Sequence, residues 1–156
     1  MAYQGQFTSG SVLTAAELNV FTPVTVLEES QSIPDATETV IAFSSAAIYD
    51  APDWHSTTVN NSRITPDVQG IYLATAHYTT GSSAVDYAFS RFYKNGGVIA
   101  NSIVQFSGTN IIGSHANSYY LEMNGTTDYI EYKVYQSSGS ARPGSIQLSL
   151  QLVAGT

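Results

Sequence analysis

The residues best suited to chemistry are two acidic side chains and a histidine that lie close together, Asp50, Asp53 and His55. Oxygen ligands on a flexible loop suit calcium, so these three are the best metal candidates in the chain. Aspartate in a loop more often forms turns by bonding its own backbone, and we therefore predict neither a metal site nor a cofactor. The other two histidines lie in unrelated contexts, without the spacing of a zinc site.

The tryptophan in the same stretch has two interpretations. An exposed ring on a distal loop would stack on sugars, which would make Trp54 and His55 a receptor contact, whereas a lone loop tryptophan also commonly folds back on the core. The eleven tyrosines leave the same choice open, because their rings suit recognition surfaces and are also ordinary strand material.

Sequence motifs of enzymes are not found. No serine lies in a GxSxG elbow, the twelve acidic residues form no telling pair for glycoside hydrolysis, and no glycine-rich loop joins a strand to a helix. Ser114 and His115 are neighbours in sequence only, which is not evidence of a catalytic triad. We therefore expect no enzymatic activity, and a hydrolase is only the third hypothesis.

The composition excludes several classes of partner. The 156 residues suffice for one domain, and charged residues make up 11% of them, against roughly 25% in ordinary domains. The net charge is −7 and the five basic residues are scattered, so binding to nucleic acid or to an anionic membrane is not expected. Cysteine is absent, and no apolar run follows Met1, so we expect no signal peptide, no membrane insertion and synthesis in a cytoplasm.

Strands must position the candidate residues, because helical periodicity disappears after residue 23. Residues 71–78 alternate without charge on either face, which predicts a central strand covered on both faces, with Gly70 free to take positive φ where it begins. Residues 146–152 form the cleanest half-buried strand, and Asn95-Gly96 is the strongest hairpin signal. Eight to ten strands at this spacing indicate an all-β fold, a two-sheet antiparallel sandwich or jelly roll.

The N-terminal stretch, residues 1–23, differs from the rest of the chain. Thr14 and Glu17 make a capping box for a helical turn, with Leu13 and Leu18 placed as its hydrophobic staple. A helix this short is not stable alone and must dock, either on its own domain or on a partner protein. The residues that we assign to anchoring are Phe7, Leu13, Thr14, Glu17, Leu18, Asn19 and Phe21.

Short motifs follow one another along the chain in a recognisable order. They are QSIPDAT at 31–37, VIAF at 40–43, YD at 49–50, HS at 55–56, SRITP at 62–66, GIYL at 70–73, FYKNG at 92–96 and DYIEYKVYQ at 128–136, preceded by GSVLTAAELN at 10–19. This series resembles the virion-associated trimeric jelly-roll proteins of bacteriophages. That group is similar to the globular head of complement's first component and to tumour necrosis factor.

The resemblance implies a ten-strand jelly roll over residues 24–156, a threefold homotrimer, a non-enzymatic role and a place on the virion surface. Two functions remain open, because one fold hosts both. One is capsid decoration, as a cement or short head-fibre protein attached to a capsid or other virion protein. The other is receptor binding by a tail or fibre adhesin, with a host-surface glycan as ligand. The chain has no long coiled-coil or fibrous stalk, which favours decoration, and its low charge fits inner strands buried against copies of themselves.

Overall fold

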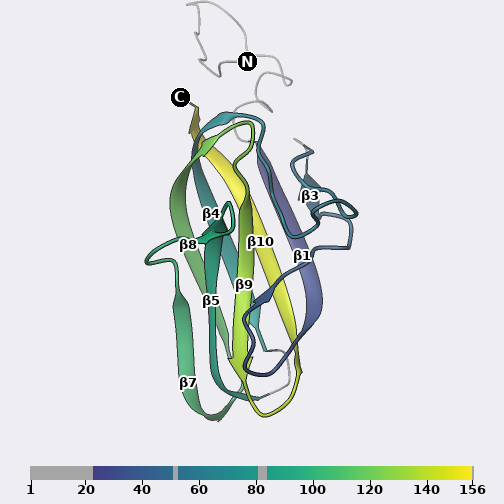
Figure 1. Ribbon diagram of the computed structural model, residues 1–156, viewed down its shortest axis with the longest axis vertical. Helices are drawn as coiled ribbons and strands as arrows, with labels where there is room; N and C mark the ends of the chain where they lie inside the picture. The colour runs from purple at the N-terminus through teal and green to yellow at the C-terminus, as the bar shows by residue number, and fades with distance from the viewer. Residues whose placement is uncertain (1–22, 51–52, 81–83, 156) are drawn as a thin grey trace, which may run out of the picture.

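Ten strands form two antiparallel sheets in the computed structural model, which describes residues 23–50, 53–80 and 84–155 (Figure 1). The predicted all-β, two-sheet jelly roll is therefore confirmed. The strands are β1 (Val24–Ile33), β2 (Thr39–Val40), β3 (Tyr49–Asp50), β4 (Gln69–Thr79), β5 (Val85–Lys94), β6 (Gly97–Val98), β7 (Val104–Ile111), β8 (Ser114–Asn124), β9 (Ile130–Ser137) and β10 (Arg142–Gly155).

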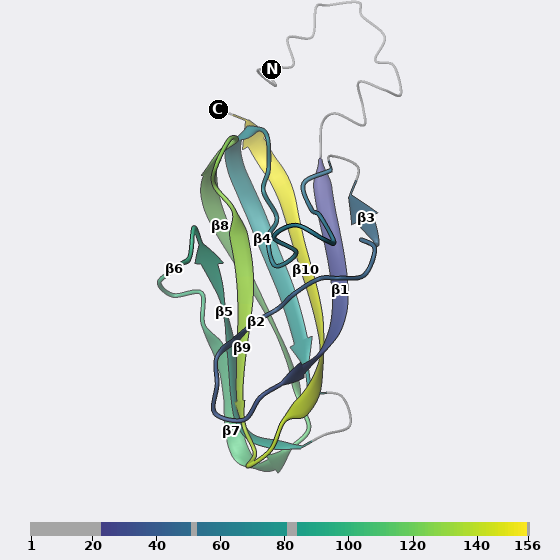
Figure 2. The same ribbon diagram turned by 45° about the vertical axis from the view of Figure 1, so that its right-hand side comes forward.

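The two sheets are built from strands far apart in the sequence. The first sheet has the strand order β3-β1-β10-β4-β8. The second sheet has the order β2-β9-β5-β6, and β7 also pairs with β5. The sheets face each other across the core, as the side view in Figure 2 shows. Residues 142–155 pair with both β1 and β4, so the C-terminal strand lies in the middle of the first sheet.

The core is filled by the inward positions of alternating strands. On β10 the inward residues Ile146, Leu148, Leu150 and Leu152 are buried, which confirms the alternation predicted for this strand. They meet the inward side chains of β4 and, across the sandwich, a second group of buried residues. That group includes Phe92, Ile130, Tyr132 and Val134.

The predicted tight turn is present between β5 and β6. Tyr93 pairs with Val98 and Lys94 with Gly97, which leaves Asn95 and Gly96 as the two loop residues. Both have positive φ, 53° and 76°, the conformation that a two-residue hairpin requires and that asparagine and glycine adopt most readily.

Strand β4 is central, as predicted, but only one of its faces is covered within the chain. Tyr72 and Tyr78 are fully buried, whereas Ile71 is 41% exposed and His77 is also exposed. The expectation that both faces are covered is therefore wrong for a single chain.

The role expected of Gly70, to take positive φ where β4 begins, is wrong as well. Its φ is not positive, and it is required because a Cβ there would lie 2.4 Å from the carbonyl oxygen of Ala154 on β10.

The predicted N-terminal helical turn and all seven anchoring residues lie outside the described residues, so both remain predictions. The start of β1 pairs with the end of β10, Val24 opposite Gln151, so the first described range begins at the end of the first sheet where β10 ends (Figure 2). No helix in the described ranges has the length and apolar character needed to cross a membrane.

Candidate functional site

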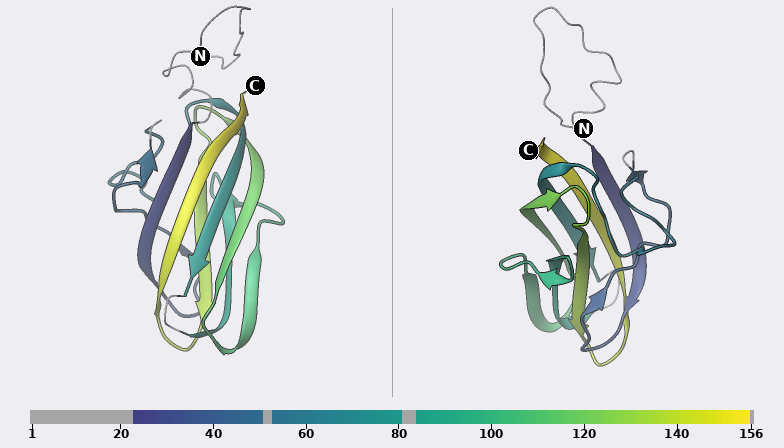
Figure 3. Two further views of the ribbon diagram at one scale, coloured as in Figure 1. Left: turned by 180° about the vertical axis from the view of Figure 1, so that it is seen from behind. Right: turned by 45° about the horizontal axis from the view of Figure 1, so that its top comes forward.

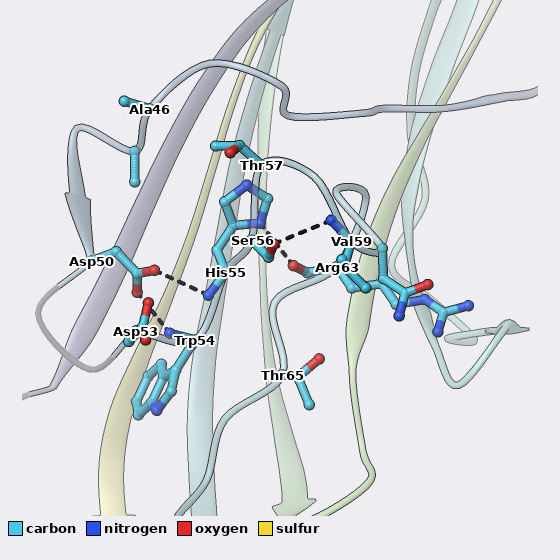
Figure 4. Close-up of a pocket in the computed structure, with 12 residues that line it drawn as sticks. Ala46, Asp50, Asp53, Trp54, His55, Ser56, Thr57, Val59, Arg63 and Thr65 are labelled. Carbon is cyan, nitrogen blue, oxygen red and sulfur yellow. Dashed lines mark hydrogen bonds between the residues drawn. The ribbon is translucent and has the colours of Figure 1, made fainter.

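Asp50 organises the loop that contains the predicted metal and receptor residues (Figure 4). Its Oδ1 accepts hydrogen bonds from the Thr25 hydroxyl at 2.5 Å and from the Trp54 backbone N–H at 3.0 Å, and its Oδ2 accepts from the His55 N–H at 3.0 Å. Asp53 occupies a left-handed conformation, with φ of 59°, in the same turn. The carboxylate of Asp50 thus shapes the backbone, which is the turn-forming alternative considered from the sequence.

The weak metal candidates do not form a coordination site. The carboxylate oxygens of Asp50 already accept hydrogen bonds from the protein, and both ring nitrogens of His55 lie 3.0 Å from backbone carbonyl oxygens, those of Arg63 and Phe43. Among residues 23–50, 53–80 and 84–155, no group of three histidine or acidic side chains is placed to hold a metal ion.

Trp54 and His55, the predicted receptor contacts, point inward. Trp54 is 4% exposed, its indole N–H donates to Asp67 at 2.7 Å, and its ring packs edge-on against Tyr72 with centroids 5.5 Å apart. The packing of a loop tryptophan on the core is therefore the arrangement observed. A receptor contact through Trp54 remains a prediction that this placement does not favour, because the ring has little surface left for a ligand.

A serine and a histidine meet in the interior, a contact not predicted from the sequence. The Nε2 atom of His115 on β8 is hydrogen-bonded to the Ser90 hydroxyl on β5, which also accepts from Tyr132 on β9. The same Tyr132 hydroxyl lies 2.8 Å from Oδ1 of Asn117, so its single hydrogen is shared between Ser90 and Asn117. Because 25 residues separate Ser90 from His115, only the facing of the two sheets brings them together.

This buried cluster is structural, although it contains the side-chain types of a hydrolase. Ser90 is fully buried, so its hydroxyl does not reach a substrate, and no carboxylate orients the Nδ1 atom of His115, which is buried without a partner among the described residues. Burial, with a smaller contribution from the charge of His77, lowers the pKa of His115 to about 4. Burial also raises the pKa of Tyr78 to about 12 and raises that of Tyr132.

The outward side of the first sheet is a second candidate surface, which we call the open face (Figure 3, left). It carries no lysine or arginine on the described strands, and its carboxylates are Glu28 on β1 and Glu122 near the end of β8. Apolar side chains lie toward one end, with Ile71 41%, Tyr120 63% and Val153 53% exposed. Small polar and apolar residues fill the rest, among them Thr75, Ala116, Ser118, Gln147 and Ser149.

The outward side of the second sheet is different in character. Phe89 and Tyr135 stack at 4.9 Å with an interplanar angle of 10°, and Tyr87 packs against both, so the three form an aromatic cluster. Beside it, Arg91 makes two hydrogen bonds to the carboxylate of Glu38, at 2.8 and 2.9 Å. Phe89 and Tyr135 are cross-strand neighbours, and Tyr87 lies two residues from Phe89 on β5. The contacts stabilise the sheet, and all three rings are half-buried.

Comparison with known proteins identifies the fold. No family model and no curated protein sequence matches the chain. Among solved structures, the PRD1 vertex protein P5 is similar at 13% identity and a TM-score of 0.66, over 84% of this chain and 96% of that one.

Two further structures agree with this match. The globular domain of zebrafish complement 1qA matches at 13% identity and a TM-score of 0.56, over 86% of this chain and 99% of its own. Murine APRIL matches at 12% identity and a TM-score of 0.52, over 83% of this chain and 99% of its own. None of the three is described as an enzyme. The three are a phage vertex protein, a complement globular head and a TNF-like protein, all jelly rolls, so the resemblance noted in the sequence is confirmed for the fold of this chain.

Proposed function

We propose that this chain is a non-enzymatic structural protein of a virion that assembles as a homotrimer through its open face. The observation that carries the proposal is the open face itself, a central sheet surface with exposed Ile71, Tyr120 and Val153 and without any lysine or arginine on the described strands. Apolar surface of this kind is stabilised when it is covered, and a second copy of the same face covers it in a closed assembly.

The threefold order and the virion location rest on likeness. The sequence motifs resemble trimeric virion proteins, and one of the similar structures is a phage vertex protein. Capsid decoration, as a cement or short head-fibre protein, is the specific role that we favour. In this role residues 1–23 attach the trimer to a capsid or other virion protein, through apolar side chains such as Phe7, Leu18 and Phe21, while residues 24–156 form the projecting domain.

Deletion of residues 2–22 tests the attachment. The shortened chain should still form trimers, because the open face is intact, but its binding to purified particles, measured by co-sedimentation, should be lost. A matched control is the full chain with Val98→Ser, which changes an exposed hairpin residue of β6 and should bind as the wild type does. Undiminished binding of the deletion variant would contradict the anchoring role.

Receptor binding, with a host-surface glycan as ligand, is the second candidate function, and the aromatic cluster favours it. If the open face is covered by other copies, the second sheet faces outward and presents Tyr87, Phe89 and Tyr135. Aromatic side chains beside arginine are typical of binding hot spots. Replacing Tyr135 with serine should then slow adsorption of particles to host cells, and an unchanged adsorption rate counts against this function.

A further inference from the structure

His77 is the only histidine on the described part of the open face, and histidine is the residue type whose ordinary titration lies closest to neutral pH. It lies on β4, between Gln147 of β10 and Ala116 of β8, and its side chain is exposed. Together with Thr75 and Ser118, these residues line a shallow hollow in the sheet surface. His77 therefore occupies the small-residue part of the surface that self-association would cover.

No acidic group is placed to stabilise a charged His77 within one chain. Its cross-strand neighbours Gln147 and Ala116 are uncharged. Glu28 lies beyond Gln147 on β1, two strands away, which is about 10 Å at ordinary strand spacing. Glu122 is six residues along β8 from Ala116, about 20 Å at the usual rise per residue.

His115 is the other titratable group close to His77, from the opposite side of the sheet. It precedes Ala116 on β8 and points into the core, and the charge of His77 contributes to its pKa shift, after burial. Like charges at these two positions repel each other. Because His115 stays neutral until about pH 4, it supplies no counter-charge either, and solvent is what stabilises a proton on His77.

We propose that protonation of His77 weakens the assembly, so that the trimer holds at neutral pH and dissociates in mild acid. This inference rests on the proposed self-association through the open face. Assembly removes the solvent that stabilises the imidazolium, and a closed threefold assembly brings three copies of the same charge together. The neutral imidazole has neither cost, since it is a small polar group among serine, threonine and glutamine side chains.

Sedimentation velocity of the full chain over a dilution series tests the inference at about pH 7.5 and about pH 5.5, on either side of the usual histidine titration. The wild-type trimer should need at least about tenfold more protein to assemble at the lower pH. His77→Gln should assemble equally well at both values, and His77→Lys should be monomeric at both. Near-UV circular dichroism should report a folded chain throughout, because the pKa of His115, about 4, lies well below the acidic condition.

The results that would overturn the role of His77 differ from those that would overturn self-association through the open face. A wild-type trimer that persists undiminished at the lower pH, or a His77→Gln variant that remains as acid-sensitive as the wild type, overturns the role of His77 alone. Stronger assembly in acid also overturns it, and would indicate that Glu28 of another copy pairs with the charged ring. A folded wild-type chain that is monomeric at both pH values overturns the self-association, and the role of His77 with it.

Discussion

Acid should destabilise the folded chain through His115, and the effect can be worked out from its surroundings. The pKa of this histidine is lowered from 6.5 to about 4, first by burial and then by the charge of His77. The folded state therefore favours the neutral ring, while the unfolded chain takes up a proton once the pH falls below about 6.5. Stability is complete above that pH and is lost progressively as the pH falls toward 4.

Each pKa unit corresponds to ~1.4 kcal/mol, so a fully enclosed ring would lose ~3 kcal/mol over this range. His115 is only partly buried, and solvent screening reduces the expected loss to about 2 kcal/mol. The variant His115→Gln keeps a hydrogen-bonding group near Ser90 without a titrating ring. Between about pH 7 and pH 4.5, the wild type should therefore lose about 2 kcal/mol more free energy of unfolding than this variant.

Urea denaturation at a fixed protein concentration measures the difference, because other groups that titrate in this range contribute equally to both proteins. His77→Gln is the second comparison, because it should remove only the acid sensitivity that comes from assembly and leave most of the part that comes from His115 in place. Parallel stability curves for the wild type and His115→Gln would refute the argument, as they would show that the buried ring is charged as easily as a free one.

Three other substitutions test the packing and the open face. Leu148→Ala removes a fully buried side chain from the middle of β10 and should cost about 3 kcal/mol in urea denaturation, whereas a cost below about 1 kcal/mol would contradict its central position. Gly70→Ala should lower the free energy of unfolding by ~1–3 kcal/mol, because the new Cβ would lie 2.4 Å from the Ala154 carbonyl oxygen. The control Gly113→Ala, whose Cβ would have its nearest contact at 3.5 Å, should leave the stability nearly unchanged. Equal losses of stability in the two variants would refute this explanation. Tyr120→Lys should convert the trimer to a folded monomer in size-exclusion chromatography, because it places a charge in the interface. The control Val98→Lys, on β6 and outside the open face, should remain trimeric. A trimeric Tyr120→Lys variant would exclude that part of the open face from the interface.

The parts of the fold that could be predicted are those specified by local sequence. The alternation at 146–152 gives β10 its inward face, and Asn95-Gly96 supplies two residues that tolerate positive φ. Both features are set by neighbours within a few positions, so no knowledge of distant contacts is needed.

The candidate site depended on long-range contacts, and there the sequence was a weaker guide. The loop at Asp50 is compatible in sequence with either a metal site or a turn. Local backbone hydrogen bonds from Trp54 and His55 make the turn, but the further hydrogen bond from Thr25 comes from 25 residues away. The pairing of Ser90 with His115 has no local signal, because it arises from the facing of β5 and β8 across the core.

The uncharged alternation at 71–78 was interpreted as a strand covered on both faces, yet one chain covers only the inner one. A sequence records that a surface is apolar or uncharged, but not whether its own chain or another copy covers it. The same residues that identify β4 as a central strand are thus the basis for proposing self-association.

The mass of the full chain in solution tests the central claim most directly. One chain has a mass of 16.7 kDa. Sedimentation equilibrium at about neutral pH, where an ordinary histidine is mostly uncharged, should give three times that mass. A folded protein that keeps the mass of a single chain at every concentration would contradict assembly through the open face.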